Sequence, residues 1–200
     1  MEIIFATQNP HKLHEIQHLL GTSFLLKSLK ELNFSEDIPE TQATLEGNAL
    51  EKARFIYKRY GKACFADDTG LEVTALNGAP GVYSARYAGS LSDFGTEQKR
   101  SAANIQKLLG ALKEKNDNTA RFRTVIAYID SQGKEHLFDG IVTGSILSEL
   151  RGDGGFGYDP VFVPDGYNET FAEMPLSSKN KISHRARAFK SFHEFLMKSE

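Results

Sequence analysis

Apolar residues along the chain form continuous runs and alternating stretches that are typical of β-strands. The continuous runs lie at residues 3–6 and 63–66, and their lack of polar positions predicts buried strands. Residues 71–75 alternate between apolar and polar side chains, which indicates a strand with one buried face. Two longer strand-like segments, residues 122–129 and 136–147, are joined by a glycine-containing turn and predict a hairpin.

Other segments carry apolar residues three and four positions apart, the spacing of a helix that buries one face. Such segments begin near Pro10, Leu45, Thr96 and Ser183. In the second of them, Glu51 and Lys52 are expected on the solvent side. The mixture predicts an α/β fold in which a long mixed central sheet is flanked by helices. Residues 1–200 contain no linker or repeat, so we expect one domain with two lobes and the active cleft between them.

The sequence Asp67-Asp68-Thr69-Gly70 directly follows the second apolar run, and we expect it where that strand ends. Two adjacent carboxylates at a buried strand end need a cation, hydrogen-bond donors or water. Because successive strand residues face opposite ways, only one of the two is expected to face a given cleft. A carboxylate on a rigid strand end is suited to hold Mg²⁺, whereas the alternative is an ordinary surface turn.

The segment Thr7-Gln8-Asn9-Pro10-His11-Lys12 ends the first strand and begins a helix. Asn9 is suited to cap that helix, and Pro10 to occupy its first position. Unpaired backbone N–H groups at a helix N-terminus attract anions, and the Lys12 ammonium adds positive charge. This loop is therefore a candidate phosphate site, although it lacks the spacing of a Walker A loop and Lys12 also fits a solvent-exposed helix lysine.

A glycine-rich segment, residues 151–157, leads into two aromatic residues, Phe156 and Tyr158, that are able to flank a planar base. The alternative is a flexible loop whose aromatic side chains lie in the core. Further along, His184 and Arg185 fall in the first turn of the last predicted helix. An arginine there opposes the helix dipole, so its position indicates either a functional role or a tolerated exposed side chain.

Composition limits the classes of function. The apolar fraction is 40% and the net charge is -2, so no overall basic field favours nucleic acid. The single cysteine, Cys64, excludes an internal disulfide framework and is expected to be a buried apolar residue in a reducing compartment. Neither a signal-peptide pattern nor a run of transmembrane length is present. We therefore expect a cytoplasmic protein that binds neither nucleic acid nor membranes.

Five motifs taken together resemble the noncanonical purine nucleoside triphosphate pyrophosphatase family, the inosine and xanthosine triphosphate house-cleaning enzymes. They are ATQNPHK at 6–12, ETQATLEGNALEKA at 40–53, DDTGLEVTALNGAPGVYSARYAG at 67–89, GFGYDPVF at 155–162 and SHRARA at 183–188. Because they run from the first strand to the last helix, the resemblance covers nearly the whole chain. It implies hydrolysis of ITP, dITP and XTP to the monophosphate and pyrophosphate, with Mg²⁺ as cofactor and a homodimer as the assembly.

The resemblance also implies roles for individual residues. Asp68 is expected to be the base that activates water and a metal ligand, and Glu40 the second metal ligand. The loop of residues 7–12 and Lys179 are expected to hold the phosphates. The remaining substrate-binding residues that the resemblance implies are Thr69, Phe156, Gly157, Tyr158, Asp159, His184 and Arg185.

Two rival functions are compatible with these residues. One is a house-cleaning pyrophosphatase that acts on modified pyrimidine nucleotides, and substrate profiling would distinguish it. The other is a non-catalytic nucleotide-binding module, such as a sensor. The presence of Asp68 and Glu40 argues against the second, because binding alone does not require a base.

Overall fold

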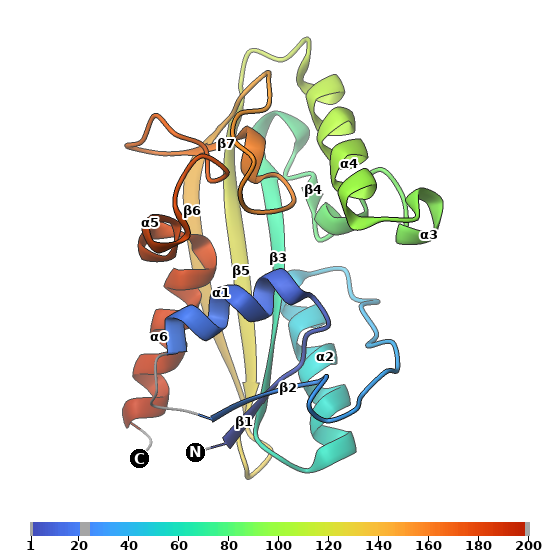
Figure 1. The fold of residues 1–200 in the computed structure, drawn as a ribbon, viewed down its shortest axis with the longest axis vertical. Coiled ribbons are helices and arrows are strands. Elements are labelled where there is room, and N and C mark those ends of the chain that lie inside the picture. The colour runs from blue at the N-terminus through green and yellow to red at the C-terminus, as the bar shows by residue number, and fades with distance from the viewer. Residues whose placement is uncertain (1, 21–24, 199–200) are drawn as a thin grey trace. The chain divides into compact units, whose positions relative to one another are not determined.

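The computed structural model describes residues 2–20 and 25–198, which form a mixed sheet with helices packed against it (Figure 1). The strands are β1 (Glu2–Phe5), β2 (Leu25–Ser28), β3 (Cys64–Val73), β4 (Pro80–Gly81), β5 (Thr119–Ile129), β6 (Glu135–Ile146) and β7 (Phe162–Pro164). The helices are α1 (Pro10–Leu20), α2 (Leu45–Tyr60), α3 (Leu91–Phe94), α4 (Glu97–Leu112), α5 (Leu176–Ile182) and α6 (His184–Lys198).

The strand order is β2-β1-β3-β5-β6-β7, and β4 pairs with β3 off this path. β1 runs parallel to both β2 and β3, whereas β3 with β4 and β6 with β7 are antiparallel. The expected α/β fold with a mixed, helix-flanked sheet is therefore confirmed. The chain divides into two compact units, and the divisions fall within β3, β5 and β6 and between α5 and α6.

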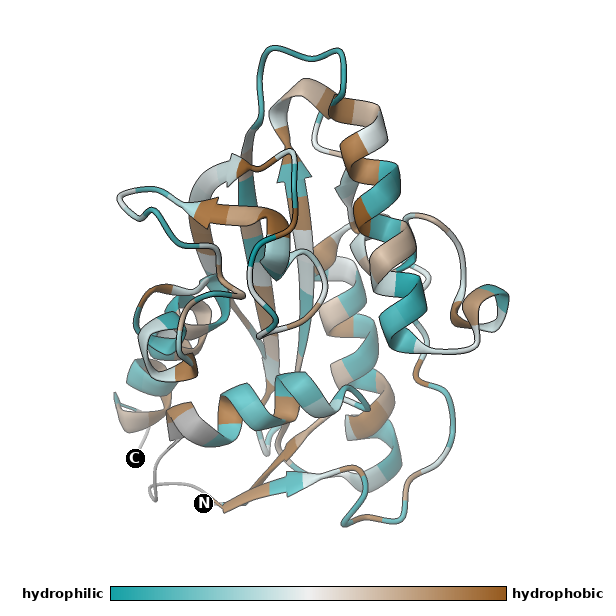
Figure 2. Cartoon of the chain, turned by 45° about the horizontal axis from the view of Figure 1, so that its top comes forward, coloured by the Kyte–Doolittle hydropathy of each residue, from teal (hydrophilic) through white to brown (hydrophobic). Residues whose placement is uncertain are grey.

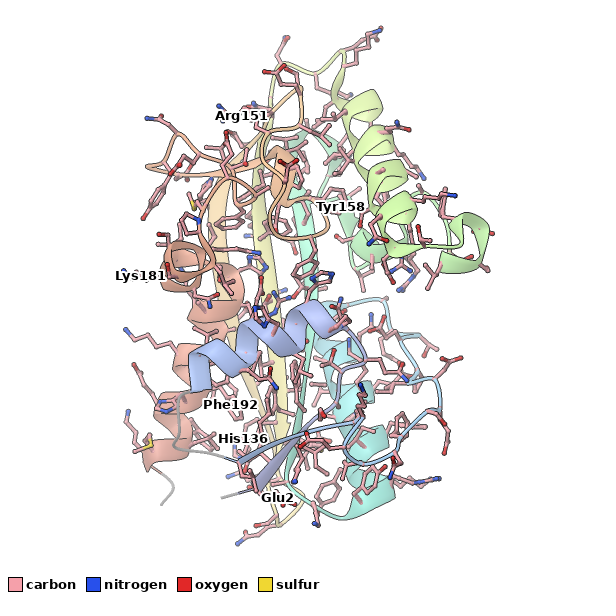
Figure 3. The ribbon with its side chains drawn as sticks, in the orientation of Figure 1. Glu2, His136, Arg151, Tyr158, Lys181 and Phe192 are labelled. Atoms are coloured by element: carbon pink, nitrogen blue, oxygen red, sulfur yellow. The ribbon has the colours of Figure 1, made fainter. Side chains whose placement is uncertain are left out.

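The first unit comprises Met1–Asp68, Thr124–Gly140 and His184–Glu200. α1 and α6 pack together on one face of its strands (Figure 1). Their core is aromatic: Phe5 and Phe65, paired in the β1–β3 register, stack with ring centroids 4.4 Å apart. Phe192 of α6 lies 5.0 Å from the Phe65 ring (Figure 3). This packing fixes α1 and α6 against β3.

The opposite face of these strands is covered by α2. Cys64 alternates with Phe65 and therefore points the other way, and its thiol contacts the carbonyl of Ala53 on α2 at 3.2 Å. Cys64 is fully buried, as expected, and burial raises its pKa to about 12. Hydrophobic residues lie in stripes between hydrophilic ones along the helices (Figure 2), the pattern from which they were predicted.

The second unit comprises Thr69–Arg123 and Ile141–Ser183. Its core joins β3, β5, β6 and β7 to α4 and to the loop that follows β7. Phe122 and Phe162 pack edge to face with centroids 4.7 Å apart, and Phe171 lies 5.3 Å from Phe162. Ile105 and Leu108 supply the buried face of α4.

One prediction about local structure is wrong. The Asp67-Asp68-Thr69-Gly70 sequence was expected to end its strand, but it lies inside β3, which continues without interruption to Val73. Asp67 and Asp68 are both buried in this strand and both have cationic partners, so the chain has no need to bring them to solvent. The period-two segment at residues 71–75 is thus largely the second half of the same strand.

Candidate active site

Asp68 lies on the face of β3 that is covered by α2, and that helix binds its carboxylate. Asn48 Nδ2 donates to Oδ2 at 3.1 Å, and Lys52 Nζ donates to Oδ1 at 3.2 Å. The residue is 8% exposed, so these two donors supply most of what solvent would otherwise provide. The carboxylate therefore has a fixed orientation, which a general base or a metal ligand requires.

Glu40 and Asp68 meet at the same cation, the Lys52 ammonium. Lys52 Nζ lies 2.5 Å from a Glu40 oxygen and 3.2 Å from an Asp68 oxygen. Burial by itself disfavours the charged ammonium, but the Asp68 and Glu40 carboxylates outweigh it and raise the pKa of Lys52. Lys52 therefore stays a cation between two carboxylates.

Sequence reasoning placed Lys52 on the solvent side of its helix, and that prediction is wrong. Lys52 is only 5% exposed. Asn48 and Lys52 are four residues apart on α2 and therefore share one face, with the buried Ala49 and Ala53 beside them. The four-residue spacing from Asn48 was the sequence signal that Lys52 shares its face of α2. The lysine by itself does not show that two carboxylates from other segments bind it.

Asp67, the neighbour of Asp68, faces the opposite way, toward α1 and α6. Its Oδ1 lies 3.0 Å from Lys12 Nζ, and Arg185 Nε donates to its Oδ2 at 3.2 Å. Burial would raise the pKa of Asp67, but Lys12 and Arg185 outweigh it and hold the pKa well below its usual range. Arg185 in turn donates to the Glu15 carboxylate from Nη1. These four residues form a chain of alternating charge in which Lys12 is half-buried and the other three are buried.

The segment of residues 7–12 begins beside Asp67 because β1 runs parallel to β3 and ends at Phe5, which pairs with Phe65, so the chain leaves β1 alongside the middle of β3. Asn9 caps α1 as predicted: its Oδ1 accepts the backbone N–H groups of His11 at 2.9 Å and Lys12 at 3.3 Å. The expectation that these N–H groups are unpaired is wrong, because the Asn9 side chain already binds them. The Lys12 ammonium, whose pKa is lowered mainly by burial, is the remaining cationic group of this loop.

In the second unit, Lys179 and Asp159 form a buried ion pair at 2.8 Å, and each residue is 3% exposed. The same Asp159 oxygen accepts the backbone N–H of Phe156 at 2.8 Å. Lys179 Nζ also lies 5.2 Å from the centre of the half-buried Phe156 ring. The structure thus joins three predicted site residues, although in its present arrangement the Lys179 ammonium is bound to a carboxylate.

Tyr158 has the surroundings of a core residue (Figure 3). It is 4% exposed, and its hydroxyl donates to the Ser84 carbonyl at 2.9 Å. Burial raises the pKa of this phenol above its ordinary value. Gly157, between Phe156 and Tyr158, has φ +63°, a conformation that favours glycine and lets the two aromatic residues point differently. Of the two aromatic side chains, Phe156 is the more accessible.

Two further predicted residues flank these groups in the chain. Thr69 is half-buried and follows Asp68 in β3, and His184 is 3% exposed at the start of α6 beside Arg185.

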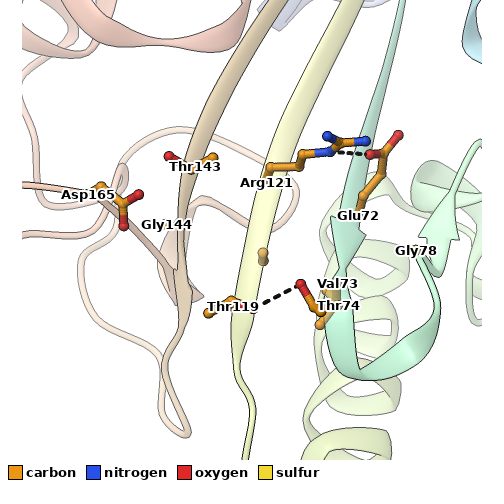
Figure 4. A pocket seen from close by; sticks show the side chains of 10 residues that line it. Glu72, Val73, Thr74, Gly78, Thr119, Arg121, Thr143, Gly144 and Asp165 are labelled. Atoms are coloured by element: carbon orange, nitrogen blue, oxygen red, sulfur yellow. Dashed lines mark hydrogen bonds and ion pairs between the residues drawn. The ribbon is translucent and has the colours of Figure 1, made fainter.

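A pocket of about 460 Å³ lies elsewhere in the second unit and contains none of the predicted residues (Figure 4). Four of its polar side chains are bound in pairs: Arg121 Nε lies 2.5 Å from Glu72, and the Thr119 and Thr74 hydroxyls are 2.8 Å apart.

Known proteins match this chain over nearly its whole length. A model of the Ham1 family matches residues 3–195. A relative from Porphyromonas gingivalis is 55% identical, and the match covers 98% of this chain and 97% of that protein. Another from Christiangramia forsetii is 52% identical, with 99% and 100% covered. Both relatives bear the name dITP/XTP pyrophosphatase.

Solved structures agree with this match. The Ham1 protein of Staphylococcus aureus superposes with a TM-score of 0.87 at 36% identity, covering 100% of both chains. A HAM1 protein from Coxiella burnetii gives a TM-score of 0.87 at 39% identity, with 99% of each chain covered. The similarity therefore extends over the full length in both sequence and fold.

Proposed function

The chain belongs to the Ham1 family, and on that premise we propose that it hydrolyses noncanonical purine nucleoside triphosphates such as dITP, ITP and XTP. The products are the nucleoside monophosphate and pyrophosphate. The observation that carries the proposal at the site is that the buried Asp68 and the exposed Glu40 share one buried cation, the Lys52 ammonium. A module that only binds nucleotides has no need of an oriented basic carboxylate at this place.

Mg²⁺ is the cofactor that we propose, with Glu40 and Asp68 as the residues that would hold it. The donor chemistry fits, because both carboxylates already contact one shared cation. Among the residues that the structure describes, no cluster of three or more His, Cys, Asp or Glu side chains is arranged around a metal position. Mg²⁺ is commonly held by one or two carboxylates together with substrate phosphates. When bound, the ion would neutralise charge on the phosphates.

Asp68 is the proposed general base. Its carboxylate accepts the proton of the attacking water while Asn48 and Lys52 keep it oriented. The water oxygen forms a bond to one phosphorus of the anhydride that joins the α and β phosphates. The bond from that phosphorus to the bridging oxygen breaks, and the bridging oxygen leaves with the electron pair. Lys52 supplies a fixed positive charge beside these groups, which favours the negative charge that builds up in the transition state.

The phosphate groups are proposed to bind the loop of residues 7–12, with Lys12 as its cation. Lys12 pairs with Asp67, and that carboxylate also has Arg185 as a partner. Asp67 therefore stays compensated if Lys12 turns toward a phosphate oxygen, and the exchange leaves no buried charge alone. Thr69 is included as a hydroxyl donor next to the base.

Recognition of the purine is proposed to involve Phe156, Gly157, Tyr158, Asp159 and His184. Phe156 is the stacking side chain, and Asp159 with Lys179 holds the backbone that carries it. A phosphate contact by Lys179, which the resemblance implies, remains a prediction that requires Lys179 to leave Asp159. Two nitrogens of Arg185 are bound by Asp67 and Glu15, so we propose that Arg185 mainly supports Asp67.

The assembly and location are also proposals. A homodimer follows from the family resemblance, and a cytoplasmic location follows from the single buried cysteine, which favours a reducing compartment. Of the helices that the structure describes, none combines the length and apolar character needed to cross a membrane.

The test is pyrophosphate release from ITP, dITP, XTP, ATP, GTP and a modified pyrimidine triphosphate at equal Mg²⁺. Hypoxanthine and xanthine present an acceptor at O6 and a donor at N1, the reverse of adenine, so mismatched donors in the site are left unpaired with ATP. We expect ITP, dITP and XTP to exceed ATP by roughly 10²-fold or more in kcat/KM. EDTA should abolish the activity and Mg²⁺ restore it; preference for the pyrimidine, or EDTA-resistant turnover, would contradict the proposal.

A further inference from the structure

The segment that carries Glu40 is bound to α2 by one carboxylate, that of Glu51. The backbone N–H of Thr41 donates to Glu51 Oε2 at 2.7 Å, and the Thr41 hydroxyl donates to Oε1 at 2.7 Å. Gln42 Nε2 adds a third bond to Oε1 at 3.1 Å. Hydrogen bonds to a charged acceptor are stronger than neutral ones. Glu51 therefore anchors the residue that directly follows Glu40.

Asn48 connects this segment to Asp68. Its Oδ1 accepts the backbone N–H of Gln42 at 2.9 Å, while its Nδ2 donates to Asp68 Oδ2 at 3.1 Å. Asn48 is fully buried. A carboxamide carries both an acceptor and donors, so this one side chain sets the distance between the Glu40 segment and Asp68.

The close approach of this segment to α2 also explains why a glycine, Gly47, lies in the first turn of the helix. A Cβ on Gly47 would lie 2.7 Å from Gln42 Cβ and 3.2 Å from the Thr44 hydroxyl oxygen. Glycine inside a helix is less favourable than alanine by about 1 kcal/mol, so its presence in the first turn of α2 calls for a local reason. The contact with Gln42 supplies it, because only glycine lets the segment lie flat on α2.

Together, these contacts attach the segment to successive turns of one helix face. Asn48, Glu51 and Lys52 are three and four residues apart on α2, and they hold Gln42, Thr41 and Glu40 respectively. The ladder ends at the Lys52 ammonium, where Glu40 and Asp68 meet. Within this ladder, the Glu51 carboxylate binds Thr41 and Gln42, the two residues that follow Glu40.

We propose that Glu51, with Asn48 and Gly47, is a positioning residue that holds Glu40 and Asp68 in one arrangement at the cation site. The inference rests on the proposed role of Glu40 and Asp68 as Mg²⁺ ligands. Neighbours that orient metal ligands commonly change metal affinity by 10–100-fold when they are replaced. Glu51 contributes through the backbone beside Glu40, without contact to metal or substrate.

The experiment measures Mn²⁺ binding by electron paramagnetic resonance to the whole protein without nucleotide. Glu51→Gln keeps the shape but loses the charge that binds Thr41, and we expect about 10-fold weaker Mn²⁺ binding. Gly47→Ala should act in the same direction by lifting Gln42 from the helix. Thr41→Val removes only the hydroxyl donor, so its effect should be smaller. Hydrogen exchange at the Thr41 and Gln42 amides should quicken in Glu51→Gln.

The matched control is Glu31→Gln. Glu31 also accepts both the backbone N–H and the hydroxyl of one residue, Ser28, at 2.8 and 2.7 Å, but it holds no predicted ligand. The Mn²⁺ affinity of Glu31→Gln should be within twofold of the wild type. Its change in thermal stability should be similar to that of Glu51→Gln. Equal losses of Mn²⁺ affinity in Glu31→Gln and Glu51→Gln would overturn the proposal, because the effect would then come from general destabilisation of the protein.

Unchanged Mn²⁺ affinity in Glu51→Gln despite faster amide exchange would also overturn it, as would a wild type that binds no Mn²⁺. Failure of the proposed function is separate. If the wild type releases no pyrophosphate from ITP but Mn²⁺ binding still depends on Glu51, Glu40 and Asp68, the positioning role stands and the assigned reaction falls. If Glu40→Gln and Asp68→Asn leave Mn²⁺ affinity unchanged, the cation site and the positioning role fall together.

Discussion

Asp67 and Asp68 are adjacent in β3, yet their carboxylates are bound by different helices. Asp67 pairs with Lys12 of α1 and Arg185 of α6, whereas Asp68 is held by Asn48 and Lys52 of α2. The alternation of strand side chains separates them onto the two faces of the sheet. The two acids therefore differ in what their replacement should do.

Replacement of Asp68 tests its role as the base. Asp68→Asn keeps the shape but removes the negative charge and the basicity, so turnover of ITP should fall by at least ~10²-fold. Binding of ITP, measured by calorimetry, should persist, because the residues proposed to bind the purine ring and the phosphates remain. Near-wild-type turnover in the folded variant would remove Asp68 from this role.

Replacement of Asp67 should act first on stability. Asp67→Asn leaves Arg185 and Lys12 with less negative charge in a buried site, and breaking such a pair destabilises by about 3–5 kcal/mol. The free energy of unfolding in urea at pH 7 measures this. The control is Asp117→Asn, a half-buried residue of the loop before β5 whose carboxylate accepts from the Thr119 backbone N–H, and this variant should change stability far less.

The pH dependence of the Asp67 contribution follows from its lowered pKa. Burial opposes the shift, but Lys12 and Arg185 hold the folded-state pKa below that of the unfolded chain, about 3.9. The stabilisation is therefore complete above that value and is lost as pH falls toward the folded-state pKa. The difference in unfolding free energy between wild type and Asp67→Asn should shrink below about pH 4; a constant difference would mean that the carboxylate charge contributes nothing.

Lys12 is expected to act on the phosphate end of the ligand. Lys12→Ala should weaken binding of pyrophosphate by about 1.5–3 kcal/mol, the range for a hydrogen bond to a charged group. Binding of inosine, which has no phosphate, should change little. Equal losses for the two ligands would instead show that Lys12 acts through the folding of its buried network.

Phe156 is expected to act on the purine end of the ligand. Stacking of a base on an aromatic side chain contributes about 1–3 kcal/mol, so Phe156→Ala should weaken inosine binding by that amount and leave pyrophosphate binding unchanged. Phe156→Tyr keeps an aromatic face and serves as the control. Should both variants bind inosine like the wild type, the base rests elsewhere.

The sequence by itself determined the features that depend on neighbouring residues. Asn9 and Pro10 begin α1 because capping requires only a side-chain oxygen and the following backbone N–H groups. The apolar runs around Phe5 and Phe65 predict buried strands because nothing polar interrupts them. The order of the five motifs likewise indicates the family without reference to contacts.

The tertiary structure alone decided which charged groups are buried and with whom. Lys52 lies between Glu40 and Asp68, and Lys179 against Asp159, although the sequence places each partner at least 12 residues away. A lysine on a helix has the same local pattern whether it meets solvent or a carboxylate. Its position depends on whether folding brings a counter-charge that offsets the loss of hydration, and that partner comes from another segment of the chain.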